Sequence, residues 1–248
     1  YKDKKTDQNI SNMYANREPR FYASVVYQGR SWFKKWMNGN PNYIVDFSAG
    51  GGNDLSNGDN VKTGYMLGKF KNRTVNHASG DTQSWERVSI IYRLAEFYLF
   101  YAEALNETDP SNPDIIKYID MVRERAGIPG YQTMNDNGIK TGIIGNYDKQ
   151  FDAIQHERYV ELYCEGQRYF DIRRWMICGD KDRIGCDQTR FYGMNMKGSK
   201  DKTPGEPTSY YTRTKVENRQ WTDKLYLYPI HQNVIELANG RIPQNYGW

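Results

Sequence analysis

Residues 151–175 read "FDAIQHERYVELYCEGQRYFDIRRW", and this stretch decides the fold because it combines a helical charge pattern with aromatic residues. Glu157, Glu161 and Glu165 recur at intervals of four. Side chains four residues apart are neighbours on the surface of a helix, so the three carboxylates share one face. The stretch therefore predicts a helix with a concentrated negative charge.

A glycine interrupts this pattern at Gly166, and a second charged and aromatic segment follows it. Glycine readily takes the conformation that ends a helix. We expect one helix at about 148–165, a break at the glycine, and a shorter helix at about 167–177. Together they form a helix hairpin.

The glutamates allow two interpretations. Carboxylates at i and i+4 lie about 6 Å apart, near the spacing that a retaining glycosidase needs, so Glu157 and Glu161 are a candidate catalytic pair. Three carboxylates in a row also repel one another and require nearby cations, which guanidinium groups supply in bidentate contacts. We favour a structural clasp, with Arg123 and Arg125 as further cations. Its expected members are Glu157, Arg158, Glu161, Glu165, Arg168, Asp171, Arg173 and Arg174.

The upstream sequence predicts a second hairpin. From Ser84, apolar residues follow a 3- and 4-residue spacing and indicate a helix of about five turns. A helix start follows at Asn112, Pro113 and Asp114, with Asn112 as N-cap, and Gly127 marks the end. The apolar residues are Val88, Ile91, Ala95, Tyr98, Ala102 and Leu105 in the first helix, and Ile115, Ile119, Val122 and Ala126 in the second.

Two hairpins in series are typical of a tetratricopeptide-like stack. We expect a mainly α fold in which helix hairpins at 84–178 lie between loop-rich parts at 1–83 and 179–222. Runs such as "FYASVVY" and "NYIVDF" indicate a few short strands in the first loop-rich part. Residues 223–248 add a short strand, a helix at about 231–239 and a tail.

Composition limits the function classes. The 248 residues carry 34 basic and 30 acidic side chains, with a net charge of +4 and no basic stripe, so nucleic acid is not the expected partner. Apolar runs fall short of the roughly 20 residues that span a bilayer, and no export signal is visible at the start. Membrane attachment would need an anchor outside this segment.

The three cysteines leave one question open. Cys178 and Cys186 flank a short loop that a disulfide would close in an oxidising compartment, but two unpaired thiols fit equally well. We expect Cys164 to be a small buried apolar residue.

Four stretches resemble the C-terminal region of the SusD/RagB family: "NREPRFYASVVYQG" (16–29), "YRLAEFYLFYAEALNE" (92–107), "ERYVELYCEGQRYFDIRRW" (157–175) and "YLYPIHQNVIELANGRIPQN" (226–245). The resemblance implies tetratricopeptide-like helix pairs with a loop-rich subdomain. It also implies a lipid-anchored protein on the extracellular face of the outer membrane. Such proteins capture nutrients, usually glycans, and cover a SusC-type TonB-dependent transporter.

Aromatic loops are the expected ligand site, because sugar C–H faces stack on rings while hydroxyls need polar partners. The stacking candidates are Trp32, Trp36 and Tyr43, with Asn38, Asn40 and Asp46 as hydrogen-bonding candidates. A second cluster contains Phe191, Tyr192 and Asn195. We expect no cofactor, since the glycines at 50–52 lack a phosphate-loop context, and the histidines lack zinc spacing. Calcium at Asp54, Asn57 and Asp59 is left open.

The sequence therefore favours a non-enzymatic glycan-binding protein. Two rivals remain: a glycoside hydrolase that uses the helix carboxylates, and a helical-repeat scaffold that binds proteins.

Overall fold

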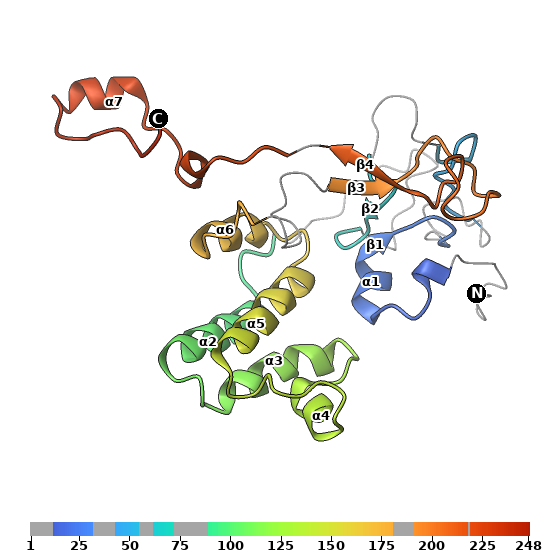
Figure 1. Ribbon diagram of the computed structural model, residues 1–248, viewed down its shortest axis with the longest axis horizontal. Helices are drawn as coiled ribbons and strands as arrows, with labels where there is room; N and C mark the ends of the chain where they lie inside the picture. Colours follow the sequence, from blue (N-terminus) through green and yellow to red (C-terminus); the bar gives the residue numbers. More distant parts are fainter. Residues whose placement is uncertain (1–11, 32–42, 55–61, 72–88, 181–190, 218) are drawn as a thin grey trace. The chain divides into compact units, whose positions relative to one another are not determined.

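The computed structural model describes residues 12–31, 43–54, 62–71, 89–180, 191–217 and 219–248. The described part is mainly helical with a few short strands, which confirms the expected fold class (Figure 1). The chain divides into two compact units. Unit 1 comprises 1–47, 51–54 and 65–166, and unit 2 comprises 48–50, 55–64 and 167–248.

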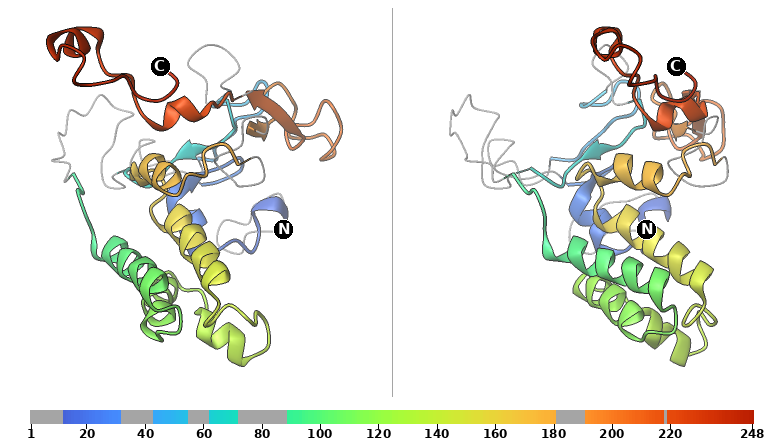
Figure 2. Two further views of the ribbon diagram at one scale, coloured as in Figure 1. Left: turned by 60° about the vertical axis from the view of Figure 1, so that its left-hand side comes forward. Right: turned by 90° about the vertical axis from the view of Figure 1, so that its left-hand side faces the viewer.

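Three helices build the core of unit 1. Helices α2 (Leu94–Thr108) and α3 (Asp114–Arg125) form a hairpin and lie side by side, and α5 (Tyr147–Glu161) packs against both (Figures 1 and 2). Burial of their shared apolar face drives this packing. The core residues from these helices are Leu99, Ala102, Ile115, Ile116, Ile119, Val122, Ala153 and Ile154, and they are joined by Tyr131 and Ile143 from the segment between α3 and α5.

Helix α2 begins later than its apolar spacing predicts. Ile91 is 77% exposed and precedes the helix, which starts at Leu94, while Ser84 and Val88 lie outside the described residues. Arg93 has an extended backbone at the N-cap position, and its side chain contacts glutamates near the end of α5. The expected start is wrong: residues 89–93 are not helical, and Arg93, which makes these ionic contacts, takes the N-cap position.

Helix α3 follows its sequence signals closely. The Asn112 side chain accepts a hydrogen bond from the backbone N–H of Asp114 at 3.0 Å, although the N-cap position itself falls on Pro113. Ile115, Ile119 and Val122 are buried as expected. Gly127 takes a φ of +78°, the left-handed conformation that favours glycine after a helix.

The short helix α4 (Tyr131–Asp136) has no clear signal in the sequence. The carboxylate of Asp120, a residue of α3, accepts hydrogen bonds from the backbone N–H groups of Tyr131 and Gln132 at 2.5 and 2.9 Å. It thereby satisfies two donors at the start of the helix. A Cβ at Gly130 would lie 2.5 Å from Asp120 Cγ, so only glycine fits there.

The quoted charged stretch contains the expected break. Helix α5 ends at Glu161 instead of 165, and Gly166 has a φ of +87°. In unit 2, helix α6 (Gln167–Arg174) is shorter than expected. Cys164 is exposed with a φ of +59°, so its expected burial is wrong: the chain has already left the helix, and the helical period no longer places this side chain inward.

The first part of unit 1 is less extended than its sequence predicts. In "FYASVVY" the helix α1 (Pro19–Ser24) precedes a two-residue strand β1 (Val25–Val26), which pairs antiparallel with β2 (Met66–Leu67). A proline at the first helical position favours this start. In "NYIVDF" only Ile44 makes a β-bridge, with Ser31. The 3₁₀ turn η1 (Asn12–Tyr14) precedes α1.

Unit 2 contains a β-hairpin and a C-terminal segment. Strands β3 (Phe191–Met194) and β4 (Arg213–Glu217) pair antiparallel, with an irregularity between Phe191 and Tyr192. The short strand expected within 223–248 is wrong, since these residues contain a 3₁₀ helix η3 (Asp223–Tyr226) and no strand. Helix α7 (Gln232–Leu237) follows. No helix within the described ranges has the length and hydropathy needed to cross a bilayer.

Candidate functional site

Glu157 occupies the centre of an ionic cluster in unit 1. Its side chain is fully buried, and its two oxygens pair with Arg20 at 2.5 Å and Arg123 at 3.1 Å. Arg20 comes from α1 and Arg123 from α3. A buried carboxylate needs such partners, because an uncompensated charge away from water is strongly unfavourable.

Glu161 and Glu165 continue this cluster. Glu161 pairs with Arg20 at 3.0 Å and also with Arg93 and Arg125. Glu165 pairs with Arg93 at 2.6 Å and with Lys69. Side chains of α1, α2, α3 and α5 and their flanking segments therefore meet at one set of carboxylates.

The electrostatics of the cluster contradict a catalytic pair. Burial alone would raise the pKa of Glu161, but hydrogen bonds from Arg93 and Arg20 outweigh it and hold that pKa below its usual value. The pKa of Glu165 is lowered in the same way, against burial, by Arg93 and Lys69. A glycosidase acid needs a raised pKa in an open cleft. Glu157 and Glu161 are instead buried against guanidinium groups, so the hydrolase hypothesis for this pair is not supported.

The cations of this cluster are partly the expected ones. Arg123 and Arg125 do contact the glutamates, whereas Arg20, Lys69 and Arg93 were not anticipated. They lie 68 or more residues from their partners along the chain, and no local spacing reveals them.

The remaining expected members of the clasp have other contacts. Arg158 is buried, with its guanidinium 4.3 Å from the centre of the Phe100 ring. In unit 2, Arg174 pairs with Asp171 at 2.9 Å. Arg173 stacks on Tyr169 at 3.4 Å, and Arg168 lies in the same helix, α6.

The first expected ligand site is described only in part. Trp32, Trp36, Asn38 and Asn40 lie outside the described residues. Tyr43 is half-buried and donates a hydrogen bond from its hydroxyl to Asn53 Oδ1 at 3.0 Å.

Asp46 belongs to the same loop. Its carboxylate accepts a hydrogen bond from Gln28 Nε2 at 2.7 Å, and its backbone N–H donates to Asn53 Oδ1 at 3.1 Å. A Cβ at Gly51 would lie 2.5 Å from Asp46 Cγ, so the glycine allows the chain to close over this carboxylate. These contacts give Asp46 a role in holding the loop.

The second expected site lies on the β3–β4 hairpin. The Tyr192 side chain is 37% exposed, and the Arg213 guanidinium lies 4.0 Å from the centre of its ring. Arg219 stacks on Phe191 at 4.2 Å. Lys215 stands opposite Tyr192 in the strand register.

The Asn195 side chain makes different contacts from the Phe191 and Tyr192 rings. Its side-chain amide donates to Pro207 O at 2.9 Å, and its Oδ1 accepts from the backbone N–H of Lys197 at 3.2 Å. The side chain therefore organises the turn after β3.

Sequence reasoning missed the cations of the hairpin. The segment "RTKVENR" (213–219) alternates charged with uncharged residues, which is the period of a strand with one charged face. That alternation was the available signal for Arg213 and Lys215.

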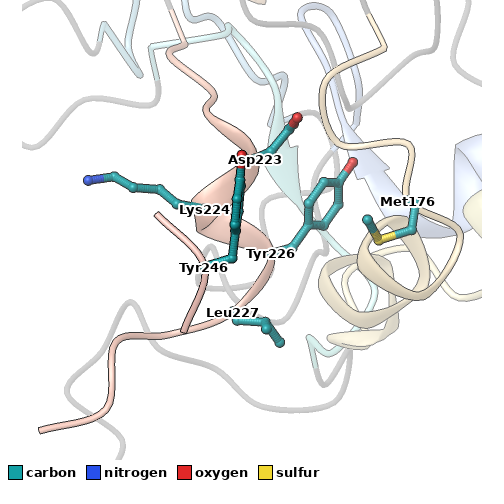
Figure 3. A pocket seen from close by; sticks show the side chains of 6 residues that line it. All are labelled: Met176, Asp223, Lys224, Tyr226, Leu227 and Tyr246. Atoms are coloured by element: carbon teal, nitrogen blue, oxygen red, sulfur yellow. The ribbon is translucent and has the colours of Figure 1, made fainter. Parts of the chain in front are cut away.

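Unit 2 also contains an open pocket of about 430 Å³, lined by Met176, Asp223, Lys224, Tyr226, Leu227 and Tyr246 (Figure 3). Three of its polar side chains have partners. The Tyr226 hydroxyl accepts a hydrogen bond from the N–H of Cys178, Asp223 accepts one from Trp221, and the Lys224 amine lies over the Trp248 ring. The exposed lining of the pocket is mainly apolar. Such a lining suits a packing surface better than a saccharide site.

The described residues contain no group of three His, Cys, Asp or Glu side chains that is arranged to hold a metal ion. Of the calcium candidates, Asn57 and Asp59 lie outside the described residues. Cys186 lies outside them too, so its pairing with Cys178 stays open.

Comparison with known proteins agrees with this architecture. The chain is 37% identical over 82 residues to SusD-like protein P2 of Formosa agariphila, and 38% identical over 94 residues to SusD-like protein P25 of the same organism. These matches cover 33% and 37% of the chain but only 16% of each relative.

A crystal structure of a SusD-like protein from Bacteroides fragilis matches the whole chain with a TM-score of 0.74 and 29% identity. The chain spans 43% of that protein. The family model described as "SusD family" matches residues 1–248. The chain therefore belongs to the SusD family.

Proposed function

We propose that this chain is part of a surface protein that binds glycans and delivers them to a transporter, without catalysing a reaction. The observation that carries the proposal is the exposed Tyr192 ring on the β3–β4 hairpin, bordered by donors, in a member of the SusD family. Aromatic rings at a polar rim are what saccharide recognition requires.

The proposed binding residues fall into two groups. Trp32, Trp36 and Tyr43 would stack on sugar rings, with Asn38 and Asn40 as hydrogen-bonding partners. Tyr192 and Phe191 would form a second contact. Asp46 and Asn195 would act by holding their loops in place, because their side chains are engaged there.

Family membership also supports a location and a partner. We infer a lipid-anchored protein on the extracellular face of the outer membrane, with the anchor outside this segment. The inferred partner is a SusC-type TonB-dependent transporter. No cofactor enters this role.

The test is calorimetry of the full-length protein against a panel of glycans. Trp36→Ala and Tyr192→Ala should each weaken binding of the recognised glycan at least about tenfold, because stacked rings dominate such contacts. Tyr92→Ala is the control, since Tyr92 is exposed at the start of the helical part of unit 1. Absence of glycan binding by the full-length protein would contradict the proposal, and unchanged affinity in both variants would remove these residues from the site.

One observation favours a second role as an interaction scaffold. The outer face of α2 and the segment before it expose Ile91, Leu94, Phe97 and Tyr101. Contiguous exposed apolar side chains mark protein contacts. Purification of a transporter complex from the native host, together with failure to bind any glycan, would favour this role over the first.

A further inference from the structure

Three cations of the β3–β4 hairpin have no carboxylate partner in the described part of the chain. Arg213, Lys215 and Arg219 are exposed, and none of them belongs to an ion pair there. The cations of the unit 1 cluster are all paired. The hairpin therefore carries positive charge that no carboxylate in the described part of the chain neutralises.

The register brings two of these cations to one face. Tyr192 pairs with Lys215, and opposed residues of an antiparallel pair point to the same side. Arg213 is two residues from Lys215, so it lies on that side as well. The alternating exposure along β4 agrees, because 213, 215 and 217 are exposed while 214 and 216 are half-buried.

The aromatic rings orient the guanidinium groups. Arg213 lies over Tyr192 at 4.0 Å, and Arg219 lies over Phe191 at 4.2 Å. A stacked guanidinium keeps the N–H groups at its edge available, and its planar fork matches a carboxylate or a sulfate. Fixing the group in advance lowers the entropy cost of binding an anion.

One carboxylate moderates this charge. Glu217 stands opposite Phe191, beyond the irregularity that separates Phe191 from Tyr192. This face of β4 thus carries two cations, Arg213 and Lys215, and one carboxylate, Glu217, which is two residues from Lys215 and four from Arg213.

We propose that the hairpin binds the anionic group of a charged glycan, either a sulfate ester or a uronate carboxylate. Arg213 and Lys215 contact the anion, and Tyr192 holds Arg213 in place. This inference rests on the proposed glycan-binding function and specifies its ligand class.

The test uses the full-length protein and polymer pairs that differ only in charge: dextran with dextran sulfate, and methyl-esterified with de-esterified polygalacturonate. The sulfated and the de-esterified polymers distinguish the two anions. The variant Arg213→Ala/Lys215→Ala is compared with Arg241→Ala/Lys197→Ala, which removes the same residue types and charge from exposed positions of unit 2. Far-UV circular dichroism and thermal melting check that both remain folded.

We expect at least one charged polymer to bind tightly and its uncharged counterpart weakly. The hairpin variant should lose at least tenfold in affinity and show a weaker dependence on salt, whereas the control should change less than twofold. Equal losses in both variants would mean unspecific attraction and would overturn the inference. Binding of neutral glycans alone would also overturn it but leave the proposed function intact.

Two other results are informative. Failure to bind any glycan would contradict the proposed function itself. If the hairpin variant keeps its affinity for charged glycans but loses the transporter in copurification, the cations serve an acidic protein surface, and the inference is wrong.

Discussion

Charged residues have two distinct roles in this protein, and their partners decide which. Glu157, Glu161 and Glu165 are buried among cations and lock segments of unit 1 together. Arg213 and Lys215 face solvent, with no carboxylate partner in the described part of the chain. Both clusters contain arginine and lysine side chains. Only the hairpin leaves the charge of these side chains available for a ligand.

Glu161→Gln is expected to destabilise unit 1 by about 3–5 kcal/mol, because it removes a buried carboxylate that Arg20, Arg93 and Arg125 share. Urea unfolding followed by circular dichroism measures this change. The control is Glu124→Gln on the exposed side of α3, for which we expect a change within about 0.5 kcal/mol. Equal effects of the two substitutions would contradict a stabilising role for the cluster.

Acid should weaken the protein through the same carboxylates. The pKa values of Glu161 and Glu165 are lower in the folded protein than the usual 4.5, so the unfolded chain takes up protons first as pH falls. Their contribution to stability is complete above pH 4.5 and is lost as pH falls through the lowered values. Melting temperatures measured from pH 7 to pH 3 should stay level and then fall below about pH 4.5. In Glu165→Gln the fall should be shallower, and an unchanged profile would contradict this assignment.

At the scale of elements, helix packing separates buried from exposed apolar residues that look alike in the sequence. Leu99 and Leu94 both belong to α2, yet Leu99 is fully buried in the hairpin core and Leu94 is 62% exposed. The difference comes from the face that α3 and α5 cover.

Leu99→Ala should therefore lower the free energy of unfolding by about 2–5 kcal/mol, through lost burial and the cavity left behind. Leu94→Ala removes the same atoms from the exposed side and should change it by less than about 0.5 kcal/mol in this chain. Chemical denaturation of both variants measures the difference. A large loss in Leu94→Ala would show that its face is covered in solution.

At the scale of the whole molecule, stability and recognition are expected to depend on different residues. Glu161→Gln should lower the melting temperature but leave glycan affinity within about twofold, measured at a temperature where the variant is folded. The hairpin variant Arg213→Ala/Lys215→Ala should show the opposite result. Calorimetry and thermal melting on the same samples provide both measurements, and a joint loss in either variant would mean that the two functions are not separate.

Local signals determined the helical architecture of this protein. The apolar spacing of α3, the asparagine and proline at its start and the glycine at its end are read within a few residues, because helix formation depends on neighbours three and four positions apart. The break at Gly166 follows from the same local chemistry.

Only the tertiary structure decided which charges are neutralised and which are left available. Arg20, Lys69 and Arg93 reach the glutamates from distant parts of the chain, and Arg93 does so from the N-cap position of α2. The exposure of Cys164 beyond the end of α5 and the cations stacked on Phe191 and Tyr192 likewise depend on packing. Sequence spacing places a side chain on a face of its own helix or strand, but which partner meets that face is set by the fold.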